Sequence, residues 1–209
     1  SGEIVQGDKT GDKPLSETVK DYLRDKFHKP GNVFLGVVHR LDRPVAGLVV
    51  FARTSKALSR LNEMFRKGEV HRTYWSITKK PAEPEGTLVN WIVRNEKQNK
   101  SYVYDKEVPN AKRAELKYRV IAHTENYHLI EVNLLTGRHH QIRCQLAHMG
   151  CPIKGDLKYG AERSNPDGGI SLHARRIAFT HPVSRLSVEI VAPVPAGDAL
   201  WKALSEGMM

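Results

Sequence analysis

The sequence is short of cysteine, of long apolar runs and of phosphate-binding glycine motifs. Its two cysteines, Cys144 and Cys151, are too few for a disulfide framework, so we expect a reducing compartment, the cytoplasm. No apolar run approaches the roughly 20 residues that span a bilayer. The polar opening SGEIVQGDKTGDK carries no secretory signal. GxGxxG and Walker motifs are absent, which gives a nucleotide cofactor no support.

Acidic residues are scarcer than basic ones. The 209 residues include 33 Lys and Arg but 23 Asp and Glu, a net charge of +10. This surplus favours a polyanionic partner such as a nucleic acid, because each neutralised phosphate releases condensed counterions. Simple solubility is the alternative. A hydrophobic content of 40% is ordinary for a globular domain.

The hydrophobic pattern alternates between helical and strand periods, and no repeat is visible. Ser16 is the expected N-cap of the first helix, and Thr54 or Ser55 caps the second, which ends at Gly68. We interpret the Lys- and Asn-rich stretch 94–113 as an exposed excursion. In chain order we expect helix 16–27, strands 34–38 and 48–52, helix 55–68, strand 70–80, loop 81–86, hairpin 114–135, a helix starting at Arg138, and strands 171–182 and 185–193. This order predicts an α+β fold with a largely antiparallel sheet flanked by helices.

The stretch HRLDRPVAG (39–47) places one acid, Asp42, among His39, Arg40 and Arg43. Its apolar flanks predict that Asp42 is buried, and charge is costly to bury unless it is paired or used. A neighbouring arginine favours the ionised carboxylate, which can act as a nucleophile or base. A buried Asp–Arg clamp that fixes a turn explains the same residues equally well.

Two further stretches carry polar residues in suggestive places. In TGRHHQIR (136–143) a helix N-terminus with Arg138 would suit a phosphate, although a solvated basic face explains the spacing better. Tyr74 points to one face of its expected strand, as a core residue or as a ring that stacks on a nucleobase. The series His140, Cys144 and His148 spans about 12 Å along a helix, too far to share one zinc ion.

Together these stretches resemble the RluA-type RNA pseudouridine synthases. The resemblance rests on HRLDRPVAG (39–47), the strand around Tyr74, TGRHHQIR (136–143), PIKGDLKYG (152–160) and SLHA (171–174), which occur in the family's order. HRLD followed at this distance by TGRxHQIR is a highly specific pair. The resemblance implies isomerisation of specific uridines to pseudouridine in ribosomal or transfer RNA by base flipping, with no cofactor and no metal, by a protein expected to be a monomer.

Residue by residue, the resemblance implies three catalytic side chains: Asp42 as the essential carboxylate, Tyr74 packing on the uracil or serving as a base, and Arg143 paired with Asp42. It implies that Arg40 fills the space left by the flipped nucleotide. We expect His39, Arg43, Arg138 and His140 to bind RNA as well.

The chain departs from the family pattern in places. Val45 and Ala46 stand where Thr-Ser is usual, and His139 replaces a small hydroxyl residue. The family's early NKPxG motif and a preceding S4-type domain are not seen, so we expect residues 1–32 to be a partial or trimmed segment and residues 33–209 to be the catalytic domain. Two other functions stay open: a non-catalytic RNA-binding protein and a nucleoside hydrolase.

Overall fold

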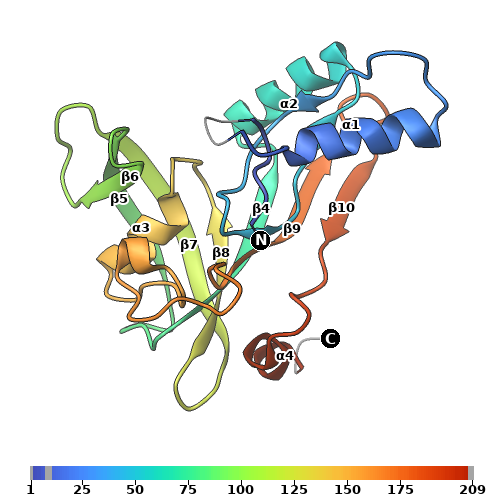
Figure 1. Cartoon of the computed structure of the whole chain (residues 1–209). Helices are drawn as coiled ribbons and strands as arrows, with labels where there is room; N and C mark the ends of the chain where they lie inside the picture. Colours follow the sequence, from blue (N-terminus) through green and yellow to red (C-terminus); the bar gives the residue numbers. More distant parts are fainter. Residues whose placement is uncertain (1, 8–10, 207–209) are drawn as a thin grey trace.

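The chain folds around one curved sheet with helices packed against it (Figure 1). The computed structural model describes residues 2–7 and 11–206. Within them lie the helices α1 (Leu15–Lys26), α2 (Ser55–Lys67), α3 (Gln141–His148) and α4 (Ala199–Ser205) and the 3-10 helix η1 (Leu157–Tyr159). The strands are β1 (Gly36–Val37), β2 (Ala46–Gly47), β3 (Phe51–Ala52), β4 (His71–Thr78), β5 (Glu85–Asn95), β6 (Lys100–Tyr104), β7 (Lys112–His123), β8 (His128–Leu134), β9 (Leu172–Thr180) and β10 (Ser187–Val191).

The main sheet has eight strands in the order β10-β9-β4-β8-β7-β5-β6, with β2 added beside β9. Every pairing along that order is antiparallel, and only β2 runs parallel to its neighbour. The predicted α+β class with a mostly antiparallel sheet is therefore confirmed. The expected strands 34–38 and 48–52 shorten to β1 and β3, which pair with each other in a separate two-stranded sheet.

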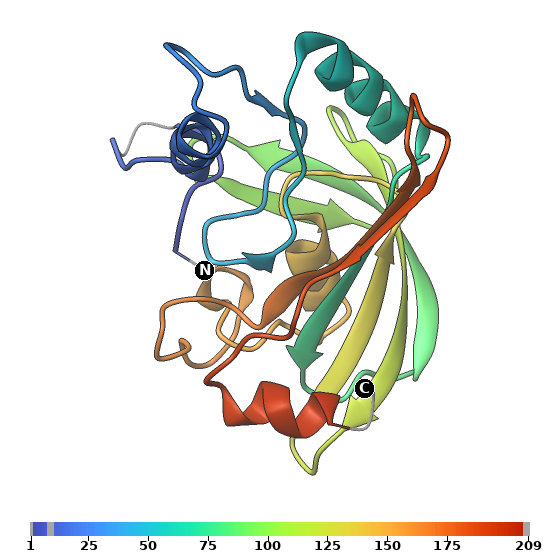
Figure 2. The same ribbon diagram turned by 90° about the vertical axis from the view of Figure 1, so that its right-hand side faces the viewer.

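Three apolar clusters attach the helices to the sheet. Ile142 and Leu146 of α3 pack against the centre of the sheet, at Ile130 and Val132. Helix α2 packs through Leu61 and Met64, and α4 covers the far end of β4 through Trp201. Figure 2 shows α1, α3 and the loops between them on the same side of the curved sheet. Among the described residues, no helix combines the length and apolarity needed to cross a bilayer.

Gly47 allows the parallel contact between β2 and β9. Its φ is +119°, and an added Cβ would lie 2.4 Å from the carbonyl oxygen of Ala174. No other residue fits so close an approach of two backbones at this dihedral. The glycine therefore fixes the loop that carries Asp42 against the centre of the sheet.

Several local predictions need correction. Ser16 is not the N-cap of α1: Pro14 holds that position, and Ser16 lies buried in the first turn. Thr54 does cap α2, accepting a hydrogen bond from the Ala57 amide, and Gly68 ends it with φ +74°. The predicted loop 81–86 gives way to β5 at Glu85.

The stretch 94–113 is not an irregular excursion. It contains the turn of the β5–β6 hairpin, all of β6 and the start of β7. Ser101 and Val103 of β6 point inward, while Tyr102 and Tyr104 are exposed. The two outward tyrosines hide the usual polar and apolar alternation, which is why the sequence pattern suggested no strand.

Candidate active site

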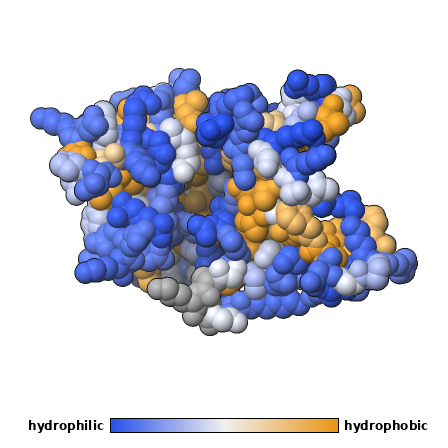
Figure 3. All heavy atoms as spheres, turned by 90° about the horizontal axis from the view of Figure 1, so that it is seen from above, coloured by the Kyte–Doolittle hydropathy of each residue, from blue (hydrophilic) through white to orange (hydrophobic). Residues whose placement is uncertain are grey.

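A cleft of about 310 Å³ opens on the side of the sheet covered by α3. Its walls come from the 39–45 loop, from β4, from the 134–143 segment and from Arg94 on β5. Seen from above, the molecule is hollowed near its middle, with hydrophilic surface around much of the hollow and a hydrophobic patch beside it (Figure 3). The HRLD and TGRHHQIR stretches, about 100 residues apart in sequence, thus face one cavity.

Asp42 lies in the loop between β1 and β2, where its carbonyl accepts a hydrogen bond from the Val45 amide. The predicted burial of Asp42 is wrong: its side chain is 30% exposed. The residue sits in a turn at the wall of the cleft, not on a strand inside the core. A reactive carboxylate in this position stays accessible to a molecule that enters the cleft.

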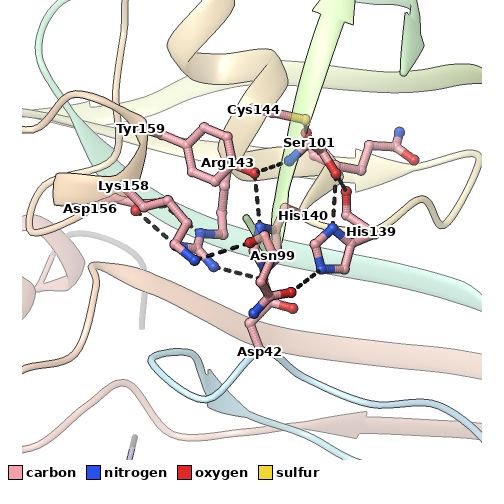
Figure 4. Close-up of polar contacts among 11 residues, drawn as sticks. Asp42, Asn99, Ser101, His139, His140, Arg143, Cys144, Asp156, Lys158 and Tyr159 are labelled. Atoms are coloured by element: carbon pink, nitrogen blue, oxygen red, sulfur yellow. Dashed lines mark hydrogen bonds and ion pairs between the residues drawn. The ribbon is translucent and has the colours of Figure 1, made fainter. Parts of the chain in front are cut away.

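Arg143 joins two carboxylates. Its Nη1 lies 3.1 Å from Oδ2 of Asp42. Its Nε and Nη2 donate to Oδ2 and Oδ1 of Asp156, at 2.7 and 2.8 Å. Burial is the largest influence on Arg143 and opposes its charge, but the hydrogen bonds to Asp156 and Asp42 and the charges of both carboxylates together outweigh it and raise the pKa of Arg143. Arg143 is therefore a permanent cation in a fixed orientation (Figure 4).

Asp156 was missed as a site residue by sequence reasoning. Its side chain is 1% exposed and lies at the N-terminus of η1, in the stretch KGDLKYG. The bidentate pair leaves only one nitrogen of Arg143, Nη1, for Asp42. Asp42 is thus held at one oxygen without being fully neutralised. A GD pair after a helix is the sequence signal, but nothing in the spacing ties it to Asp42.

Two side chains of β4, Arg72 and Tyr74, face the cleft. Tyr74 is 7% exposed, and burial raises its pKa, with Arg72 opposing that rise. The side chain is a neutral phenol at neutral pH, which suits stacking better than proton removal. Arg72 lies over the Phe65 ring at 5.4 Å, and among the described residues no carboxylate pairs with it. Sequence reasoning missed this half-buried, uncompensated cation.

Two histidines of the predicted RNA-binding set line the cleft. The Nε2 atom of His39 accepts a hydrogen bond from the Val50 amide, and its ring stacks on Phe65. Burial, helped by Arg72, lowers the pKa of His39 to about 4. His140 is 8% exposed, with Nε2 3.6 Å from Oδ2 of Asp42. Both rings belong to the wall of the cleft, and their predicted contact with RNA stays a prediction.

The predicted RNA-binding arginines lie in different settings. Arg40 is exposed at the cleft. Arg138 also lines it and donates from Nε to the carbonyl of Arg113. Arg43 lies outside the cleft lining, where it pairs with Asp12 at 2.7 Å. The expected helix start at Arg138 is wrong, because α3 begins at Gln141.

Gln141 explains why the turn before α3 is ordered. Its Oε1 accepts hydrogen bonds from the Thr136 hydroxyl and the Arg138 amide, and its Nε2 donates to the carbonyl of Glu115. His140 then adopts φ +53° as the N-cap. The side chain of Gln141 thus shapes the TGRHH turn that forms one wall of the cleft.

The fold and the basic, carboxylate-centred cleft define an enzyme-like domain suited to a polyanion, and comparison with known proteins places it in a family. The sequence model described as RNA pseudouridylate synthase matches residues 1–148. The chain belongs to this family.

Similar proteins include ribosomal large subunit pseudouridine synthase D of Xylella fastidiosa, 37% identical over 77% of this chain and 51% of that protein. A second is tRNA pseudouridine synthase C of Vibrio vulnificus, 32% identical over 93% of this chain and 84% of that protein. The chain spans about half the length of the first of these and of several other curated relatives. The solved structure of human RNA pseudouridylate synthase domain containing 4 shares the fold, with a TM-score of 0.78 at 24% identity, covering 93% of this chain and 83% of that one.

Proposed function

We propose that this chain isomerises specific uridines to pseudouridine in structured ribosomal or transfer RNA. The observation that carries the proposal is the chain of contacts from Asp42 through Arg143 to Asp156, at the wall of a basic cleft. The names of the relatives support a ribosomal or transfer RNA substrate. We place the activity in the cytoplasm and assign it to the monomer.

The reaction needs a carboxylate but no redox partner. It breaks the bond between C1′ and N1 of a uridine and forms one between C1′ and C5. The hydrogen on C5 leaves as a proton while N1 gains one, so atoms and electrons balance without a cofactor. Asp42 can serve by attacking C1′ or the base, or by removing a sugar proton. The hydrogen bond from Arg143 holds the Asp42 carboxylate in place for any of these roles.

The uridine must first leave the RNA stack, which costs a few kcal/mol. Base stacking on Tyr74 and basic contacts along the cleft offset that cost. Arg40, exposed beside Asp42, fills the vacated place in the stack. Arg72 supplies an uncompensated positive charge inside the cleft, suited to a phosphate of the bound strand.

Release of tritium from RNA carrying 5-tritiated uridine tests the proposal. We expect release by the wild type and none above background by Asp42→Asn, with RNA affinity retained. Asp25→Asn, an exposed acid on α1, is the matched control and should be fully active.

Each contrary result points to a different function. An active Asp42→Asn variant would refute the assignment of Asp42. Binding without release from any ribosomal or transfer RNA would instead favour a non-catalytic RNA-binding protein, and free uracil as the product would favour a hydrolase.

A further inference from the structure

Tyr159 connects three segments behind the cleft. It lies at the end of η1 and is 9% exposed. Its hydroxyl oxygen is 2.8 Å from the Ser101 amide of β6 and 2.8 Å from Nδ1 of His140. Figure 4 shows these contacts beside the Asp42–Arg143 pair. The role proposed above leaves Tyr159 and the tautomer of His140 unassigned.

The donors and acceptors of this group allow one consistent assignment. A backbone amide can only donate, so Ser101 donates to the Tyr159 oxygen. Tyr159 then uses its single hydrogen on Nδ1 of His140, the other atom within hydrogen-bond distance. Nδ1 is therefore unprotonated, and the ring hydrogen of a neutral His140 lies on Nε2, the nitrogen that faces Asp42.

The two other states of His140 are worse. The Nδ1–H tautomer would leave the Tyr159 hydrogen without its acceptor and would turn the Nε2 lone pair toward the Asp42 carboxylate. An imidazolium would also strand the Tyr159 hydrogen. Burial is the largest factor that disfavours the positive charge of an imidazolium here. The surrounding basic groups disfavour it further; they are Arg143 of α3, His139 of the same turn, Lys158 of η1 and Arg94 of β5. Together these lower the pKa of His140 to about 2, against the attraction of Asp42.

The backbone and neighbouring rings hold the His140 ring in place. His140 is the N-cap of α3 and its φ is +53°. The ring of His139 stacks on it with centroids 3.7 Å apart, and the Ser101 hydroxyl lies 2.7 Å from the His139 carbonyl. Ser101 of the edge strand β6 therefore holds His139 directly and His140 through Tyr159.

We propose that Tyr159 is a positioning residue that fixes His140 as its neutral Nε2–H tautomer, so that His140 and Arg143 together hold Oδ2 of Asp42 and leave Oδ1 for the uridine. Both side chains approach Oδ2, and no side chain in residues 2–7 and 11–206 donates a hydrogen bond to Oδ1 or forms an ion pair with it. The separation of 3.6 Å between Nε2 and Oδ2 exceeds a hydrogen bond, and such contacts tighten when substrate binds. The catalytic part of this inference rests on the proposed function, whereas the tautomer does not.

The tautomer is measured directly by ¹⁵N NMR of the histidine rings in the wild-type protein, with the His140 signals assigned by their loss in His140→Gln. We expect a protonated Nε2 and an unprotonated Nδ1 from pH 5 to pH 8. Protonation of Nδ1 anywhere in this range would overturn the assignment. This measurement needs neither RNA nor turnover, so it stands apart from the test of the proposed function.

The positioning role is tested by Tyr159→Phe, with Tyr118→Phe as the matched control. Tyr118 is an equally buried tyrosine on β7, and its hydroxyl lies 3.4 Å from the carbonyl of Glu83, outside the cleft. We expect Tyr159→Phe to lower kcat about 10- to 100-fold, because a reacting group held loosely loses its alignment. KM for RNA should change less than twofold. A kcat equal to that of the control would overturn the proposal.

Two variants of His140 keep the proposal falsifiable if Tyr159→Phe does not fold. His140→Gln retains an N–H donor for Asp42, whereas His140→Phe retains only the ring that stacks on His139. We expect the glutamine variant to keep at least ten times the kcat of the phenylalanine variant, at equal thermal stability. Equal kcat values would show that the donor at Nε2 has no role, and the proposal would fail.

Discussion

Replacing Asp156 by asparagine removes one charge from the core of the site without changing its shape. The buried Asp156 accepts two hydrogen bonds from Arg143, and asparagine can accept only one of them. Its NH₂ group would face a guanidinium N–H, donor against donor. Asp42, on the other side of Arg143, is held in a turn and accepts a single hydrogen bond from Arg143. It cannot replace what is lost.

Breaking a buried ion pair by removing one partner costs about 3–5 kcal/mol. For a chain of this size each kcal/mol lowers Tm by about 2–4 °C, so Asp156→Asn should melt roughly 6–20 °C below the wild type. Thermal and urea unfolding followed by circular dichroism measure this loss. An unchanged urea m-value would show that the two end states expose the same surface as before.

The chain contains a matched control for this experiment. Glu189 on β10 receives the same bidentate contact from Arg176, at 2.7 and 2.8 Å, but on the surface. Glu189→Gln should leave Tm within error of the wild type, because water and salt screen an exposed pair. Equal losses in the two variants would refute the argument, since the cost of removing Asp156 is ascribed to the burial of its pair.

Three other predictions concern the cleft and its supports. Arg72→Met should raise KM for RNA, leave kcat nearly unchanged and reduce the slope of log Kd against log salt by about 1. The control is Arg66→Met, a change on the exposed face of α2. Equal slopes for the two variants would contradict the phosphate contact. Gly47→Ala should cost about 2–3 kcal/mol in urea unfolding, since strain and the clash with a backbone carbonyl add, whereas Gly160→Ala, with φ +100° in open space, should cost about 1 kcal/mol. Because the pKa of His39 is lowered to about 4, the unfolded chain takes up a proton near pH 6.5 and the folded chain does not, so stability should fall between pH 6.5 and 4 by up to about 1.4 kcal/mol per pH unit; equal pH slopes for wild type and His39→Gln would disprove this.

Strong local patterns were enough to predict most of the sheet and helix α2. The alternation in β7 and β8 and the Thr54 and Gly68 caps of α2 are local signals that the tertiary structure does not override. The elements β2, β5, β6, η1 and α4 were not predicted, and two of them show why. β6 is an edge strand whose outward residues are aromatic, so its alternation is hidden. α4 follows a legible cap, Asp198, which accepts hydrogen bonds from Leu200 and Trp201, but the helix is only seven residues long.

The part of the candidate site that could be predicted is the part that lies in the HRLD and TGRHHQIR motifs. The resemblance to the family implied a contact between Asp42 and Arg143, and the structure places the two side chains 3.1 Å apart. The spacing of 101 residues carries no such information. Arg72 escaped notice because its lack of a carboxylate partner depends on which strands are neighbours, and the sequence does not state this.

Asp156 shows why the remainder needed coordinates. Its sequence context is one of small and polar residues, which ordinarily indicates an exposed loop, yet its side chain is 1% exposed. The carboxylate is buried because Arg143 is buried, and Arg143 is buried because α3 packs onto the sheet directly behind the Asp42 loop. Each of the three charged groups would be costly to bury alone, so their positions are decided together and not one by one. A pattern search scores residues singly or along one element. It therefore gives no reason to connect Asp156 with Asp42, although Asp156 sets the orientation of the guanidinium that contacts Asp42.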